Sequence, residues 1–308
     1  MRDSAVQVGG QIPGSDRPAF QLMRPEGLPI PVLVAAPHGG RSYPAELLSG
    51  MRRADYSCLR LEDRFVDQLA QQVARQTGAT LLLAEAPRAM LDLNRAVEDV
   101  DWEMVRGGAP AGTRHSIANR RARSGLGLVP RRLAGLGEIW KHPLKREELE
   151  ARIAGIHQPY HRALGQALEE LRDRWGAALL VDLHSMPPLK RNYPGEQPAQ
   201  FVIGDRFGAS CDGMLVARAF RYFAAKERPA AHNRPYAGGY VLDRHAQPSR
   251  GIHAIQLEVC RATYLDRQFD QPSPDLPIMA GGIAGMVRIL AGEIAEIGRD
   301  RNLPLAAE

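Results

Sequence analysis

The 308-residue sequence predicts one α/β domain, in which a mixed and mostly parallel sheet is flanked by helices. Short continuous apolar runs, typical of strands buried on both faces, alternate with segments whose apolar residues recur at helical spacing. No repeat and no linker divides the chain. We therefore expect a single domain over residues 31–308, which carries an irregular capping excursion and is preceded by an irregular arm over residues 1–30.

The predicted elements follow in order along the chain. Gly and Pro are frequent in the first thirty residues, which indicates the irregular arm. Apolar runs predict strands over residues 32–36, 80–83, 178–183, 201–203 and 254–257. Helical spacing predicts helices from Leu61 to a C-cap at Gly78, over 144–175 with a break or kink at Pro159, over 214–223 and over 278–297.

The least regular segment covers residues 98–145 and is dense in Arg and Gly. Loops of this length in compact domains are usually functional or mobile. We interpret the segment as an excursion over the surface that caps the domain.

Composition narrows the class of protein. Hydrophobic residues make up 44% and charged residues 24% of the chain, as in compact globular proteins. The formal charge is 40 − 35 = +5, but only four basic residues are lysine and most arginines are scattered, often beside Asp or Glu. This distribution favours neither nucleic acid nor a membrane surface as partner. The exception is one basic cluster: Arg114, Arg120, Arg121 and Arg123.

Cysteine usage and the N-terminus suggest a cytoplasmic protein. Cys58, Cys211 and Cys260 are widely spaced and form no C-x-x-C pair, so the sequence predicts neither a disulfide framework nor a cysteine zinc site. The N-terminus lacks the apolar region of a secretory signal. No apolar run approaches the roughly 18 residues that a membrane span needs.

Polar residues follow four of the predicted strands. In an open α/β sheet, sites form at the carboxyl ends of the strands. His38 ends the first strand, Arg88 and the segment 92–95 follow the second, and segment 182–185 ends another, while Glu258 follows the last. Two histidines, carboxylates and an arginine at one edge suit a metal hydrolase.

His38 and His184 are the candidate metal ligands from strand ends. A catalytic zinc typically takes three protein ligands and leaves one position open. The third is expected to be a carboxylate, with Asp63 and Glu62 both open. The alternative is that each histidine is only hydrogen-bonded at a strand end.

Glu258 and the pair Asn94 and Arg95 are the other candidate site residues. A carboxylate in an apolar strand must be paired, for instance with Arg261, or must have a raised pKa that suits a general base. Asn94 and Arg95 offer an amide and a planar fork that can bind a carboxylate, or they are a helix-start asparagine beside a solvated arginine. No phosphate-binding glycine motif and no G-x-S-x-G nucleophile motif is present.

Together these residues resemble the N-formylglutamate amidohydrolase family, within the zinc carboxypeptidase-like hydrolases. The resemblance runs from about Pro31 to Asp266. Its segments are Pro37–Gly40, Glu62–Asp67, Asp92–Arg95, Gly125–Gly127, Pro159–His161, Asp182–Ser185, Ser210–Asp212, Pro235–Tyr240 and Gln256–Glu258.

The resemblance implies a zinc carboxypeptidase-like fold and an enzyme that removes the formyl group from N-formyl-L-glutamate, with one Zn²⁺ per chain. It implies that His38, Asp63 and His184 bind the metal and that Glu258 is the general base. Position 41, where zinc carboxypeptidases carry the Glu of a His-x-x-Glu pair, is arginine here, so Asp63 is expected as the ligand while Glu62 and Glu46 stay open.

The resemblance also implies substrate contacts. Asn94 and Arg95 are expected to bind the substrate carboxylate, and Arg88 to contact the oxyanion or a carboxylate. Tyr236, Tyr240 and Arg244 fall on a Gly-rich stretch that either closes over the substrate or is a structural loop.

Two alternative functions stay open at this point. The same site could remove another acyl group or a C-terminal amino acid. In the second, the basic cluster from Arg114 to Arg123 binds nucleic acid, with the steep salt dependence that phosphate contacts require. The expected partner is a small N-acyl amino acid, with no nucleic acid and no membrane.

Overall fold

The computed structural model describes residues 5–27, 29–112, 120–191, 193–195 and 197–302. Its main sheet contains β1 (Ala5–Gly9), β2 (Phe20–Arg24), β3 (Val32–Ala36), β4 (Thr80–Ala84), β7 (Ala178–Met186), β8 (Phe201–Gly204), β9 (Ala230–His232) and β10 (Ile252–Cys260). The strand order is β1-β2-β4-β3-β7-β10-β8-β9. A separate hairpin is formed by β5 (Arg132–Leu133) and β6 (Gly137–Glu138).

The four central strands, β4, β3, β7 and β10, run parallel to one another. All four are buried along their whole length. The flanking pairs β1–β2, β2–β4 and β8–β10 are antiparallel, so the sheet is mixed. The predicted α/β domain with a mixed sheet and flanking helices is therefore confirmed, and the carboxyl ends of the central strands meet at one edge.

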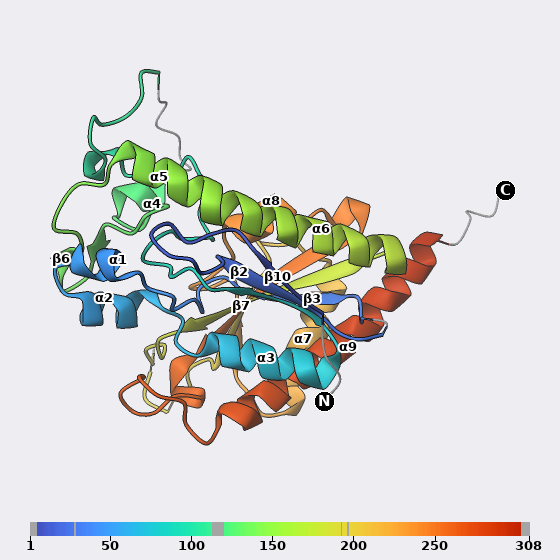
Figure 1. Cartoon of the computed structure of the whole chain (residues 1–308). Coiled ribbons are helices and arrows are strands. Elements are labelled where there is room, and N and C mark those ends of the chain that lie inside the picture. Colours follow the sequence, from blue (N-terminus) through green and yellow to red (C-terminus); the bar gives the residue numbers. More distant parts are fainter. Residues whose placement is uncertain (1–4, 28, 113–119, 192, 196, 303–308) are drawn as a thin grey trace.

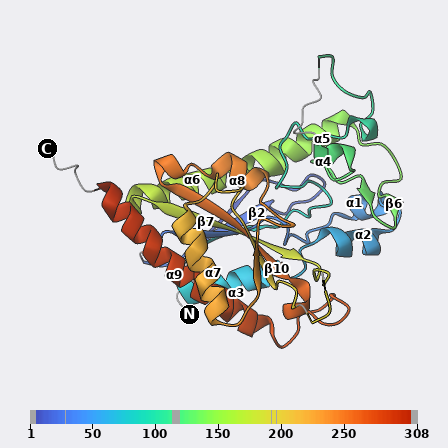
Figure 2. The same ribbon diagram turned by 180° about the vertical axis from the view of Figure 1, so that it is seen from behind.

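Helices cover both faces of the sheet (Figures 1 and 2). They are α1 (Ala45–Ser49), α2 (Ala54–Leu61), α3 (Val66–Thr77), α4 (Arg120–Arg123), α5 (Arg146–Arg152), α6 (Gln158–Trp175), α7 (Gly213–Ala225), α8 (Tyr240–His245) and α9 (Leu276–Asn302). Short 3₁₀ turns cover Trp102–Met104, Pro248–Arg250 and Arg261–Thr263. Helices α6 and α8 lie on one face, and α3, α7 and α9 on the other.

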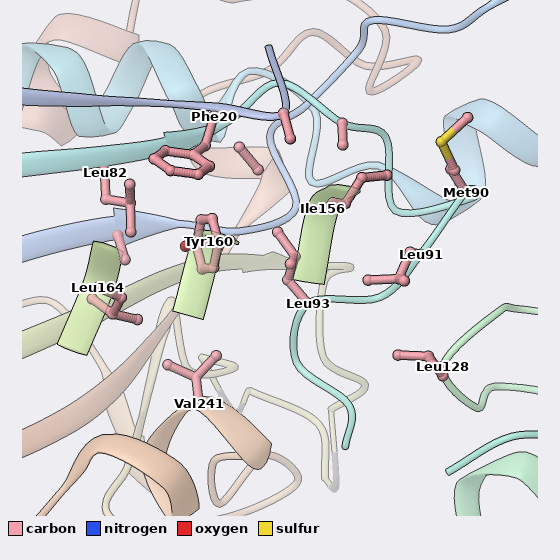
Figure 3. Close-up of a cluster of buried hydrophobic side chains, with 14 of the residues drawn as sticks. Phe20, Leu82, Met90, Leu91, Leu93, Leu128, Ile156, Tyr160, Leu164 and Val241 are labelled. Atoms are coloured by element: carbon pink, nitrogen blue, oxygen red, sulfur yellow. The ribbon is translucent and has the colours of Figure 1, made fainter. Parts of the chain in front are cut away.

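The two cores follow from the alternation of side chains along each strand. Leu33 and Ala35 of β3 pack in the core under α6, whereas Val32 and Val34 pack in the core against α3 and α9. Figure 3 shows part of the first core, where Tyr160 of α6 lies close to Phe20 of β2. Because each face of β3 packs in one of the two cores, every position along it is apolar.

The predicted irregular arm over residues 1–30 is wrong for much of its length. Strands β1 and β2 pair with each other, and β2 pairs with β4, so both belong to the main sheet. The first four residues lie outside the described part. Strand β1 is an edge strand whose side chains are mostly exposed, with Val6 54% and Val8 58% accessible, so it lacks the pattern of a half-buried strand.

The predicted helix from Leu61 is two helices, because α2 ends at Leu61 and α3 begins at Val66. Phe65 adopts a left-handed conformation with φ of 57°, which stops the helix between them. The break lets the Asp63 N–H donate to the His38 carbonyl at 3.0 Å. The predicted C-cap at Gly78 is confirmed, with φ of 75°.

The predicted disturbance at Pro159 takes the form of a wider, π-helical segment over Ile153–His157, between α5 and α6. Pro159 has no N–H to donate to the preceding turn. The Gly155 carbonyl instead accepts the Gln11 N–H at 2.8 Å, from the link between β1 and β2. The helix thereby continues past the proline and also anchors the N-terminal hairpin.

The excursion over residues 98–145 contains α4 and the β5–β6 hairpin within its described part. This part of the excursion lies beside α1 and α2, beyond the C-terminal end of β3 (Figure 1). Backbone hydrogen bonds join the two regions, from Arg52 N to Ile139 O and from Lys141 N to Gly50 O. Arg114 of the basic cluster lies outside the described residues, as does the side chain of Arg120.

Helix α9 corrects the expectation that no segment has the apolar length of a membrane span. Residues Leu276–Arg301 are long and apolar enough by length and composition, yet half of the most apolar stretch is buried inside the domain. Helix α9 packs against α3 and α7. This packing explains its apolar composition, because a helix in the core of a globular domain is as apolar as one that spans a membrane.

We predict that Gly298→Ala destabilises the protein while Gly292→Ala does not, although both glycines lie in α9. A Cβ at Gly298 would lie 1.9 Å from the Trp175 carbonyl oxygen, whereas one at Gly292 meets nothing within 4 Å. Denaturant unfolding should show a loss of about 1–3 kcal/mol for Gly298→Ala. For Gly292→Ala it should show a gain of up to about 1 kcal/mol. Equal effects would contradict the close approach of α9 to the end of α6.

Candidate metal centre and active site

Three buried side chains converge at the carboxyl edge of the sheet. His38 follows β3, His184 lies near the end of β7, and Asp63 lies in the break between α2 and α3. The two Nδ1 atoms are 3.1 Å apart, and Asp63 Oδ2 lies 3.1 Å from His184 Nδ1 and 3.5 Å from His38 Nδ1. Donors of a tetrahedral zinc site lie about 3.3 Å apart when each bond is about 2.0 Å. The donor set therefore fits a small divalent cation.

A carboxylate lies behind each imidazole. His38 Nε2 is 2.7 Å from Asp92 Oδ1, and His184 Nε2 is 2.9 Å from Asp182 Oδ2. Because a carboxylate accepts hydrogen bonds, each Nε2 is assigned the proton, which leaves the Nδ1 lone pairs facing each other. This is the outer arrangement that orients histidine ligands of metal ions.

The electrostatics of the three donors also favour a cation between them. Burial alone would raise the pKa of Asp63, but the neighbouring His184 and His38 outweigh it and hold the pKa well below its usual value. Burial would lower the pKa of His184, yet Asp182 and Asp63 raise it well above the ordinary value. Negative charge therefore dominates around the triangle.

Arg261 binds the outer oxygen of Asp63. Its Nη2 donates to Asp63 Oδ1 at 3.2 Å and to the Glu62 carbonyl at 2.6 Å, and its Nε donates to Ser185 Oγ at 3.0 Å. Arg261 therefore orients Asp63 Oδ2 towards the histidines. It is the ion-pair partner of Asp63, whereas the sequence had suggested it as a partner for Glu258.

The other carboxylates considered as ligands point elsewhere. Glu62 accepts from Tyr43 Oη at 2.8 Å and from Arg64 Nη1 at 3.0 Å. Glu46 lies exposed on α1. Among the described residues, the cluster with metal-ligand geometry contains Asp63 alone of the three candidates.

Glu258 lies beside the cluster on β10. The parallel register places it opposite His184, and places Gln256 opposite Asp182, so these four side chains share one face of the sheet. Gln256 Nε2 donates to Glu258 Oε1 at 2.8 Å. Burial raises the pKa of Glu258 to about 7, with Asp63 adding to the rise and His184 opposing it. A carboxyl group with such a pKa can exchange a proton near neutral pH.

Arg88 and Tyr236 face the same region. Arg88 Nε donates to Asp92 Oδ2 at 2.9 Å, and no described residue accepts from its Nη atoms. Burial opposes the Arg88 charge, but Asp92, Asp63 and Glu258 raise its pKa. Burial raises the pKa of Tyr236, and Glu258 and Asp63 add to that rise. The charges of Asp63 and Glu258 therefore act on both side chains.

Asn94 connects three parts of the site. Its Oδ1 accepts the Val241 N–H at 3.0 Å, and its Nδ2 donates to Gln256 Oε1 at 3.2 Å. A Cβ at Gly239 would lie 2.5 Å from Asn94 Oδ1, so the start of α8 approaches the amide closely. Within the described part of the chain, the second N–H of the Asn94 amide has no acceptor.

Arg95 lies among charges of both signs. Its Nε and Nη1 donate to the carbonyls of Leu126 at 2.9 Å and of Asn94 at 2.7 Å, and Asp99 Oδ2 lies 3.9 Å from its Nε. Burial lowers the pKa of Arg95, Asp92 and Asp99 oppose this shift, and the like charges of Arg88 and Arg121 add to it. An anion placed here would relieve that repulsion.

Three buried histidines support the loop that carries Asn94 and Arg95, a role that the sequence did not predict. His157 Nε2 donates to the Arg95 carbonyl at 2.9 Å, and His161 Nε2 donates to the Leu93 carbonyl at 3.0 Å. His161 Nδ1 is then the acceptor for His245 Nε2 at 2.9 Å. The spacing of His157 and His161 by four residues was an available signal, because it places both on one helix face.

Tyr240 and Arg244 of α8 lie against this histidine cluster. The Tyr240 ring is 5.5 Å from the His157 ring and 5.2 Å from the His161 ring. Arg244 Nη1 donates to Tyr240 Oη at 2.6 Å. The predicted Gly-rich stretch thus continues into a helix that packs beside the Asn94 loop.

Comparison with known proteins identifies related sequences and a related structure. Residues 30–265 match the profile of the family described as N-formylglutamate amidohydrolase. N-formylglutamate deformylase of Pseudomonas aeruginosa is 29% identical over 88% of this chain and 95% of its own length. The deformylase of Pseudomonas putida is 31% identical over 77% of this chain and 82% of its own length.

A crystal structure of N-formylglutamate amidohydrolase from Ralstonia eutropha JMP134 has a similar fold. It superimposes with a TM-score of 0.79 and 31% identity, over 92% of this chain and 99% of that protein.

We predict that the histidine cluster makes the protein less stable below about pH 6.5. Burial lowers the pKa of His245 to about 3 and holds that of His161 well below its ordinary value. Below pH 6.5 the unfolded chain binds protons that the folded chain does not, so the free energy of unfolding falls by about 1.4 kcal/mol per pH unit for each such histidine. His245→Gln should reduce the slope between pH 6 and pH 4 by about one proton in denaturant titrations. An unchanged slope would contradict the neutral state of His245.

Proposed function

Because the chain belongs to the N-formylglutamate amidohydrolase family, we propose that it hydrolyses the formamide bond of N-formyl-L-glutamate, or of a close N-acyl amino acid, in a metal-dependent reaction. The products are formate and glutamate. The observation that carries the proposal is the triangle of His38, Asp63 and His184, with a carboxylate behind each imidazole and Glu258 beside it.

His38 Nδ1, His184 Nδ1 and Asp63 Oδ2 are the atoms that would hold the metal, and one Zn²⁺ per chain suits two nitrogens and one oxygen at these separations. Bound there, a divalent ion supplies Lewis acidity to an amide carbonyl and to the attacking water. Asp92 and Asp182 keep both imidazoles in the required tautomer.

Glu258 acts as the general base and then as the general acid. It accepts a proton from the water that attacks the formyl carbon, and it returns the proton to nitrogen as the carbon–nitrogen bond breaks. A pKa of about 7 supports both transfers, because at neutral pH the carboxyl group is present in its protonated and in its deprotonated form. Gln256 orients the carboxylate through its hydrogen bond to Oε1.

Positive charge and hydroxyl groups bind the rest of the substrate. Arg88 and Tyr236 lie near the carboxylates of the cluster and are proposed to stabilise the developing oxyanion. Arg95 and the free N–H of Asn94 are proposed to bind a substrate carboxylate. Tyr240 and Arg244 are proposed to line the same region. Three unpaired cysteines support a cytoplasmic location.

The proposal predicts metal-dependent formate release that Asp63→Ala abolishes and Glu46→Ala preserves. The purified protein should contain about one zinc per chain, release formate from N-formyl-L-glutamate faster than acetate from N-acetyl-L-glutamate, and lose this activity to a chelator. Asp63→Ala should bind at least about tenfold less zinc in elemental analysis. Full zinc content in Asp63→Ala would refute the ligand assignment, and faster acetate release would refute the substrate.

Glu258→Gln should keep the metal but lower kcat by about 10²–10⁴, because the amide cannot accept the proton from water. KM should change much less, since the substrate contacts are assigned to other residues. Metal content and kcat measured on the same sample separate the two roles. A turnover close to that of the unaltered protein would rule out Glu258 as general base.

A further inference from the structure

A cavity of about 630 Å³ lies between α1, α5 and the capping excursion. None of the residues assigned to the metal centre or to substrate lines it. Its apolar wall includes Leu47, Met90, Met104, Trp140 and Leu144. The volume is within the range of sites for small molecules, which typically combine apolar walls with a few polar groups.

Arg152 supplies the polar group. Its side chain lines the cavity, is only 9% exposed and lies over the Trp140 ring, with 5.8 Å from the guanidinium carbon to the ring centroid. Nη1 donates to the Met90 carbonyl at 3.0 Å. Within the described ranges, Nε and Nη2 donate to no acceptor, and no carboxylate forms an ion pair with Arg152.

A buried guanidinium with one neutral partner is unusual in this protein. Arg131, also mostly buried, pairs with both Asp101 and Glu103. For Arg152, burial lowers the pKa to about 10, and only Glu148 opposes the effect. A buried cation of this kind is costly unless a charged partner reaches it.

We propose that this cavity binds a small monocarboxylate with an apolar or aromatic body. The carboxylate accepts two hydrogen bonds from the Nε–Nη2 edge of Arg152, which is the geometry that a guanidinium fork offers. The body packs against Trp140, Met104 and Leu47. The site goes beyond the proposed hydrolysis and lies apart from the residues assigned to it.

The charges of the cavity explain the preference for a single negative charge. Glu46, Glu147 and Glu148 line the cavity, and the exposed Arg106 and Lys145 offset their charge. Arg152 is the buried cation of this lining, so the second charge of a phosphate dianion or a dicarboxylate would lack a buried partner. The proposed formylated dicarboxylic substrate is therefore a poor ligand for this cavity.

The test uses 4-phenylbutyrate as probe in calorimetric titrations of the full-length metal-loaded protein. Its neutral amide and phenyl phosphate serve as matched comparison ligands. We expect one binding site per chain, and affinities for the amide and for phenyl phosphate that are about tenfold weaker or more. Equal affinity for the acid and its amide would overturn the role of Arg152, and absence of binding would overturn the site.

Variants locate the binding and separate it from the metal centre. Arg152 also holds the Met90 carbonyl, so the main variant is Ala151→Trp, which fills the cavity from an exposed position of α5. It should weaken probe binding by about tenfold or more and leave kcat/KM for the formylated substrate unchanged. Ala224→Trp, on the exposed side of α7, is the matched control and should bind as the unaltered protein does.

Arg95→Ala should retain probe binding, since its side chain belongs to the other site. Loss of binding in Arg95→Ala, or unchanged binding in Ala151→Trp, would place the probe outside this cavity and refute the proposal.

Discussion

Burial of ionisable side chains at the carboxyl ends of β3, β7 and β10 is the constraint on which the surrounding structure depends. Each such charge would cost several kcal/mol if it had no partner. Asp92 shows how the cost is met, because its two oxygens accept from His38, from Arg88 and from the Asn94 N–H. The break before α3 and the turn after β4 bring these partners into place. Among the described residues no cation forms an ion pair with Glu258, and burial raises its pKa to about 7.

A second set of hydrogen-bonded side chains holds the residues of the site in place. Asn94 joins the turn after β4 to α8 and to Gln256, and Gln256 in turn holds Glu258. His161 and His157 hold the carbonyls on either side of Asn94. Displacement of any of these groups would leave a buried polar atom without a partner, which makes the arrangement rigid. Catalytic groups held in this way need little reorganisation during a reaction.

The sequence predicts the central strands well, because an apolar run that serves two cores has no polar positions to obscure it. It therefore also predicts His38, His184 and Glu258, which end such runs. It predicts Asp63 as the ligand only through the family resemblance, with Glu62 and Glu46 open, because the break between α2 and α3 depends on the left-handed Phe65, which no local pattern predicts. Strand β1 escapes prediction because it is an exposed edge strand. The contact of His161 with His245 spans 84 residues and has no local signature.

The anchoring of the N-terminal hairpin has a consequence for the order of events during synthesis on the ribosome. Strand β2 pairs with β4, and the link between β1 and β2 is bonded to the Gly155 carbonyl in the widened segment ahead of α6. Domains generally fold as units, and the N-terminal one folds first during synthesis. Residues 5–24 emerge early, but Arg24 gains its partner Glu170 only after more than half of the chain has been made. The first strands of the nascent chain therefore complete their contacts late in translation.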